Sequence, residues 1–166
     1  MTEGKYTVTI KQSLLLLGRV IVINLIFAAV YLYFYGFHIA GNFYYYVFAF
    51  WFIVDIFPPI LLHIQYLKVN GNGIVTVSKL QHEISVQHRN EEVTKSFDDI
   101  ESLHYYVSYG YGSGWYSFES YRYYKIIFKD HSEMVITALM INKIEKKMED
   151  LLGMKATKHL RLLALI

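Results

Sequence analysis

The chain has 166 residues, of which 54% are hydrophobic and 18% charged, against about 25% charged in a typical soluble domain. Its net charge of +2 is too small to indicate a nucleic-acid-binding face, which needs clustered basic residues. The absence of cysteine excludes disulfides, thiolate chemistry and cysteine-ligated metal centres.

Two long apolar stretches lie near the N-terminus, at residues 14–37 and 43–64. Each exceeds the roughly 20 residues that a helix needs to cross a bilayer core of about 30 Å. The first stretch is too long for the apolar region of a signal peptide, and no small-residue cleavage site follows it. Because the intervening loop is short, residues 1–66 are predicted to form a two-helix transmembrane hairpin.

The flanking charges predict how this hairpin is oriented. The loop at residues 36–42 contains no Lys or Arg, whereas Lys5, Lys11 and Lys68 lie beyond the other ends of the two stretches. Positive residues remain on the cytoplasmic side of a membrane. We therefore expect a multi-pass membrane protein with both termini in the cytoplasm.

Three polar residues interrupt the apolar stretches, namely Arg19, Asn24 and Asp55. Ionisable groups inside a span are usually paired or functional. Counted from the loop, Arg19 and Asp55 lie within about 6 Å of the same level, which would allow an ion pair. The alternatives are that Arg19 extends to the interface, that a partner span meets these groups, or that they relay protons. Pro58-Pro59 predicts a kink or break in the second helix, because proline lacks a main-chain donor.

The pattern changes after residue 66, where short alternating segments separated by turn residues replace the apolar runs. We expect about seven strands followed by an amphipathic helix over residues 138–152, which Gly153 ends. The strands and helix predict a cytoplasmic domain over residues 67–153. The basic and apolar tail at 154–166 could pack on this domain, lie on the inner leaflet, or add a strand to a partner.

Residues 94–103 (TKSFDDIESL) and 123–148 carry a family resemblance. The first segment resembles a strand and Asp-Ile turn of bacterial pleckstrin-homology-like domains, and the second is similar to their late hairpin and closing helix. The whole chain resembles small bacterial membrane proteins with a transmembrane hairpin before such a domain. This resemblance implies an α+β membrane protein whose antiparallel β-barrel of about seven strands is capped by a C-terminal helix. It implies no activity.

An aromatic and glycine-rich segment at residues 105–124 is the most unusual soluble feature. Aromatic residues favour strands, protein interfaces and membrane surfaces. The candidates for a partner or membrane surface are Tyr109, Tyr111, Trp115 and Tyr116. The alternative is an aromatic face on the domain's own core. Arg122 and Lys125 are candidate contacts to anionic lipid.

No motif indicates an enzyme or a cofactor. The seven histidines lack metal-ligand spacing, and the acidic pairs are strand neighbours that point to opposite faces. We expect a non-enzymatic interaction or scaffold protein that acts as an accessory subunit of a membrane complex. The alternatives are an immunity or modulator protein that recognises a toxin or channel through its spans, and an anionic-lipid sensor. The expected partners are the lipid bilayer and a protein or a second copy, and nucleic acid is not expected.

Overall fold

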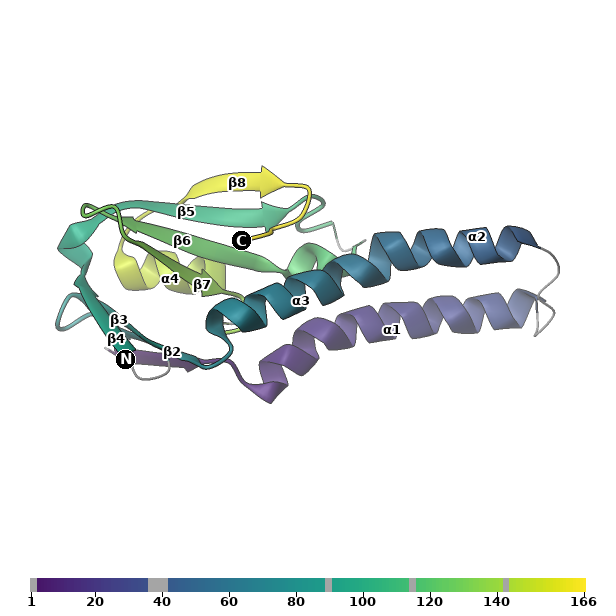
Figure 1. The fold of residues 1–166 in the computed structure, drawn as a ribbon, viewed down its shortest axis with the longest axis horizontal. Helices are drawn as coiled ribbons and strands as arrows, with labels where there is room; N and C mark the ends of the chain where they lie inside the picture. Colours follow the sequence, from purple (N-terminus) through teal and green to yellow (C-terminus); the bar gives the residue numbers. More distant parts are fainter. Residues whose placement is uncertain (1–2, 36–41, 89–90, 114–115, 142–143) are drawn as a thin grey trace.

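The computed structural model describes residues 3–35, 42–88, 91–113, 116–141 and 144–166 (Figure 1). In chain order the elements are β1 (Glu3–Thr7), α1 (Ile10–Tyr35), α2 (Asn42–Trp51), the π-helical turn η1 (Phe52–Ile56), α3 (Phe57–Asn70), β2 (Gly73–Ser78), β3 (Glu83–His88), β4 (Glu91–Ser96), the 3₁₀ turn η2 (Phe97–Asp99), β5 (Ile100–Ser108), the 3₁₀ turn η3 (Ser117–Ser120), β6 (Arg122–Phe128), β7 (Glu133–Thr137), α4 (Ile144–Leu152) and β8 (Thr157–Arg161).

The first sheet has the order β1-β2-β3-β4, with each neighbouring pair antiparallel. β1 pairs with β2 along its whole length, from Glu3 opposite Ser78 to Thr7 opposite Ile74. The helices α1, α2 and α3 are therefore inserted between two adjacent strands of one sheet. The predicted division at residue 66 differs from this arrangement, because the residues that precede α1 belong to the sheet.

α1 runs beside the continuous helical path of α2, η1 and α3, and the two project together from the sheets (Figure 1). We call them the helical pair. A π-helical turn at Phe52–Ile56 ends two residues before Pro58, which with Pro59 occupies the first turn of α3. The first turn of a helix needs no main-chain donor, so the prolines fit there and the chain remains helical. The irregularity expected at the prolines is this π-helical turn.

The second sheet has the order β7-β6-β5-β8, in which β8 runs parallel to β5. The described residues thus form two four-stranded sheets and not the expected closed barrel of about seven antiparallel strands. The C-terminal tail explains part of this difference, because β8 occupies the edge of β5. Of the three expectations for the tail, the structure shows packing on its own domain.

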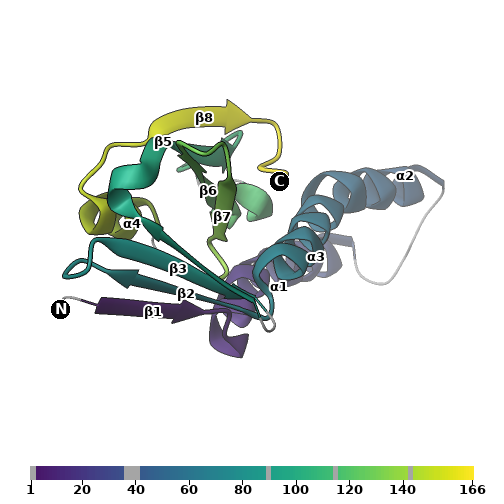
Figure 2. The same cartoon turned by 60° about the vertical axis from the view of Figure 1, so that its left-hand side comes forward.

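The main core lies between the two sheets, with α4 at one side (Figure 2). α4 contributes Ile144, Met148 and Leu152, at the spacing of one helix face. The helix begins at Ile144 and not at residue 138, because the preceding turn buries Leu139 and Met140 in two different clusters.

A second buried cluster joins the helical pair to the domain. Its members are Leu62 and Tyr66 of α3 together with Phe118, Tyr121, Tyr123, Leu139 and Ala164. Tyr66 packs edge-on against Tyr121 and Tyr123, with ring centroids 5.6 and 6.2 Å apart. The inner end of α3 is thus part of the domain core.

Asn70, the last residue of α3, fixes this helix to β7. Its Nδ2 donates to the Val135 carbonyl at 3.0 Å, and its Oδ1 accepts from the Thr137 amide at 3.0 Å. Asn70 is buried, so no water can replace it at these two main-chain groups without rearrangement.

We expect Asn70→Ala to lower the free energy of unfolding by about 2 to 4 kcal/mol, because it leaves buried main-chain groups unsatisfied. Asn72→Ala, two residues on at an exposed turn position, is the matched control and should change stability little. Denaturant unfolding of the full-length protein in detergent measures both. Equal stability of the two variants would contradict this role of Asn70.

Candidate functional site

A buried carboxylate lies where the helical pair meets the domain. Asp55, in the π-helical turn, is 2% exposed. Its Oδ1 accepts from the Ser117 amide at 3.2 Å, and its Oδ2 accepts from Asn24 Nδ2 at 3.3 Å. Asp55 thus binds both α1 and the domain. We call Arg19, Asn24, Asp55, Ser117 and Ser120 the polar junction.

Ser117 also satisfies a carbonyl that proline leaves free. In a regular helix the amide of residue 59 would donate to the Asp55 carbonyl four residues earlier, but Pro59 has no amide hydrogen. Ser117 Oγ lies 2.6 Å from this carbonyl oxygen and 2.9 Å from Asp55 Oδ1. The domain therefore supplies the donor that the helix lacks, which is how a break at proline is tolerated away from water.

The other polar residues of the helical pair complete the junction. Asn24 Oδ1 accepts from Trp51 Nε1 at 2.6 Å, while its Nδ2 also donates to the Val20 carbonyl at 2.7 Å. Arg19 Nη1 donates to Ser120 Oγ at 3.2 Å. The structure thus brings Asn24 and Asp55 together and gives each of Arg19 and Asp55 a serine partner in η3.

The C-terminal residues form a strap across the same interface. Tyr66 Oη donates to the Ala164 carbonyl at 2.8 Å, and Tyr123 Oη donates to the Leu165 carbonyl at 3.0 Å. Gln65 exchanges hydrogen bonds with the main chain of Ile166, at 2.9 and 3.2 Å. The tail therefore connects α3 to the second sheet.

The predicted aromatic surface is divided between exposed and packed residues. Tyr109 is 58% exposed, Tyr116 stacks on Phe118 with centroids 5.2 Å apart, and Trp115 lies outside the described residues. The Tyr111 hydroxyl donates to Glu145 on α4 and accepts from Arg122 Nη1. Burial, and then its bond to Glu145, raises the pKa of Tyr111. Of the candidates that the structure describes, Tyr109 is the most exposed.

The two candidate lipid contacts, Arg122 and Lys125, lie on opposite faces of β6 and have different partners. Arg122 and Lys125 are three residues apart on β6 and so point to opposite faces. Lys125 forms an ion pair with Glu133 at 2.7 Å, while Arg122 lies over the Tyr111 ring. The structure instead brings Arg122 to the same hollow as Arg19 of α1. This hollow measures about 350 Å³ and is also lined by Tyr111, Gly112, Glu119 and Ser120.

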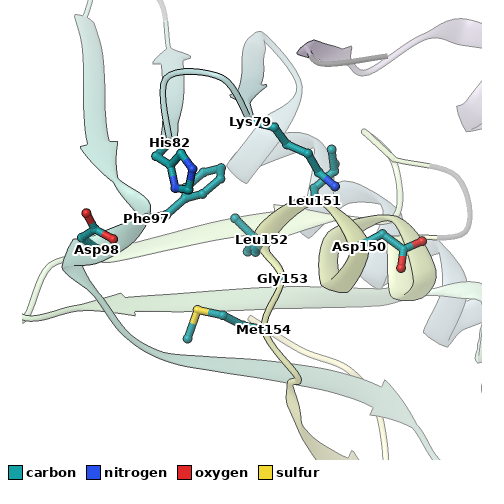
Figure 3. Close-up of a pocket in the computed structure, with 9 residues that line it drawn as sticks. All are labelled: Lys79, His82, Phe97, Asp98, Asp150, Leu151, Leu152, Gly153 and Met154. Carbon is teal, nitrogen blue, oxygen red and sulfur yellow. The ribbon is translucent and has the colours of Figure 1, made fainter.

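A second hollow, of about 340 Å³, opens at the end of the domain opposite the helical pair (Figures 1 and 3). Its apolar floor is formed by Phe97, Leu151, Leu152 and Met154, and its exposed polar residues are Lys79, His82, Asp98 and Asp150. They come from the β2–β3 turn, η2 and the end of α4. An apolar floor with charged groups at its edge is the usual composition of a binding hollow. We call it the distal hollow.

Comparison with known families agrees with this fold. A family model described as "PH domain" matches residues 5–146. The chain belongs to the PH domain family. No curated protein and no solved structure matches the chain. The matched range begins within β1, contains the helical pair and β2 to β7, and ends within α4, which agrees with the insertion of this pair into the PH domain.

Ser117 and Ser120 are the residues that sequence reasoning missed. Both lie in an aromatic-rich segment, where a serine has no pattern that distinguishes it from a turn residue. Pro59 is the signal that could have indicated a hydrogen-bond partner, because a proline leaves the carbonyl four residues earlier, that of Asp55, without its helical donor. Nothing local, however, identifies a serine of the PH domain, 58 residues further on, as that donor.

We expect Ser117→Ala to destabilise the protein by about 1 to 3 kcal/mol, because the Asp55 carbonyl loses its hydroxyl donor in a buried site, whereas the main-chain amide of residue 117 still binds the carboxylate. The control is Ser120→Ala in the same turn, which removes one bond to partly buried Arg19 and should cost about 1 kcal/mol or less. Thermal unfolding of the full-length variants in detergent measures the difference. Equal losses of thermal stability in the Ser117 and Ser120 variants would contradict the role of Asp55 as the main attachment point of the junction.

Proposed function

We propose that the protein is a non-enzymatic, membrane-anchored interaction protein whose PH domain presents a docking site to a protein partner. The chain contains two helices long and apolar enough to cross a membrane, over Ile10–Phe34 and Ala49–Asn70. Large apolar side chains of α1 such as Ile21, Leu25 and Ile26 are more than half exposed, which a bilayer would cover. In this proposal the hairpin lies in the bacterial inner membrane and both termini are cytoplasmic.

The observation that carries the proposal is the polar junction together with the C-terminal strap. Two spans and a flexible linker would be sufficient to keep a PH domain at a membrane. Here Asp55, Asn70 and Tyr66 of the helical pair each hydrogen-bond to the domain. Such contacts fix the direction in which the domain faces, and a fixed direction serves a module that positions a partner.

The distal hollow is the docking site that this orientation favours. It lies at the opposite end of the domain from the helical pair (Figure 1), so it faces away from the bilayer in which its own anchor lies. Lipid of that membrane cannot reach it, whereas a cytoplasmic protein can. The exposed charges Lys79 and Asp98 would orient a partner that places an apolar side chain on Leu152 and Met154.

A second candidate is anionic-lipid recognition at the other hollow. Arg19 and Arg122 line it beside the inner part of α1, near the inner leaflet of the proposed membrane. Recognition of a toxin or channel by Arg19, Asn24 and Asp55 is less favoured. The hydrogen bonds of Asn24 and Asp55 point inward, to each other and to Ser117.

The test is purification of the tagged full-length protein from its native membranes in mild detergent, followed by mass spectrometry. We expect a stoichiometric protein partner, and we expect its recovery to fall about tenfold or more in Lys79→Glu/Asp98→Lys, which reverses both charges of the distal hollow. Lys146→Glu, at an exposed position of α4 outside the hollow, is the control and should retain the partner.

Isolation without a protein partner would contradict the scaffold proposal. Retention of the partner by the double variant would show that docking uses another surface. Co-purification of an anionic phospholipid that is lost in Arg122→Gln would favour the second candidate.

A further inference from the structure

The part of the helical pair that projects beyond the polar junction is shorter than a membrane is thick. On α1 it comprises the 11 residues from Leu25 to Tyr35, which rise about 16 Å at 1.5 Å per residue. On the other side it comprises the 13 residues from Asn42 to Val54, which rise about 20 Å. A bilayer core of about 30 Å requires about 20 residues on each side.

Counting 20 residues inward from Tyr35 and Asn42 places the inner edge of the core at Leu16 on α1 and Leu61 on α3. The surface agrees with this position. Apolar exposure continues past the polar junction onto the face of α3 away from the domain. Its residues are Phe57, Ile60, Leu61, Ile64 and Leu67, between 38% and 50% exposed. Lys11 and Lys68 follow at about the headgroup level.

Contacts with α3 fix the level of the domain against this edge. Ser117 binds Asp55, six residues and about 9 Å on the core side of Leu61. Tyr121 Oη lies 3.1 Å from His63 Nδ1, close to the edge itself. Ile166 is bound to Gln65, about 6 Å on the headgroup side. The end of the domain that carries η3 therefore overlaps the membrane in depth.

The side chains exposed at this end suit such a position. The Tyr109 amide donates to the Arg161 carbonyl at 2.6 Å, and the Ala164 amide donates to Ser108 Oγ at 3.0 Å. The turn between these contacts carries Leu162, which is 78% exposed, beside Tyr109 at 58%. An exposed tyrosine next to an exposed leucine, with the Arg161 guanidinium over the nearby Tyr106 ring, is typical of a membrane interface, where apolar groups enter and cations meet headgroups.

We infer that the PH domain is partly immersed, so that the Leu162 turn and Tyr109 lie among the acyl chains and headgroups of the inner leaflet. This rests on the proposed membrane anchoring. The occupant is lipid because the exposed tail residues Leu165 and Ile166 lead from this turn to Gln65 on α3, and because the spans are too short without it. The inference also gives a reason for the saturated hydrogen bonding of Asp55, since polar groups at membrane depth must be satisfied by protein.

The absence of native cysteine allows a direct test with single-cysteine variants of the full chain, each labelled with an environment-sensitive fluorophore. Leu162→Cys reports on the turn, and Tyr109→Cys reports on a second position of the same surface. Leu80→Cys, on the β2–β3 turn at the far end, is the matched control because Leu80 is 76% exposed. Ile26→Cys, on the projecting part of α1, reports on membrane insertion itself. All four are reconstituted into vesicles of phosphatidylcholine and phosphatidylglycerol, with or without brominated acyl chains.

We expect quenching at Leu162 and Tyr109 within about twofold of that at Ile26, and none at Leu80. Quenching at Ile26 alone would overturn the immersion and leave the anchoring intact. Absence of quenching at Ile26 as well would overturn the anchoring. A Leu162 label that is shielded from water but not quenched would show that protein, such as a second copy, covers this end, and would equally overturn the inference.

Discussion

The pairing of β1 with β2 is the constraint on which the rest of the structure depends. The strands are neighbours in one sheet, yet the 65 residues from Val8 to Asn72 separate them, and these residues contain the helical pair. Only two residues connect β1 to α1, and only two connect α3 to β2. Neither helix can shift along its axis without straining the sheet. The insertion turns what would be an anchor on a linker into a rigid extension of the PH domain.

The polar junction adds a second fixed point further along the helices. Pro59 removes the donor of the Asp55 carbonyl, the π-helical turn brings the Asp55 side chain toward the domain, and Ser117 satisfies both groups. This arrangement uses a local defect of one helix as the attachment site for another element, which accords with the frequent occurrence of π-helical turns at functional positions. With Asn70 and the C-terminal strap, it holds α3 to the domain from Asp55 to Asn70.

Local patterns account for the parts of this fold that the sequence predicts. The apolar runs that become α1 to α3, the helical spacing of Ile144 and Met148, and the turn between β6 and β7 depend on neighbouring residues. β1 and β8 were missed because each is five residues long and finds its partner far along the chain. For the same reason Asn24 and Asp55 could be named as polar residues, whereas Ser117 could not. The closed barrel was expected from a resemblance that did not include β8.

The central claim is that the helical pair and the PH domain form one rigid body. Double electron–electron resonance between spin labels at Ile26→Cys on α1 and Lys146→Cys on α4 tests it most directly, because both sites are exposed and the chain has no other cysteine. The account predicts one narrow distance distribution that is the same in detergent and in lipid vesicles. A broad distribution, or one that changes between the two environments, would show that the domain moves on its anchor and would contradict the account.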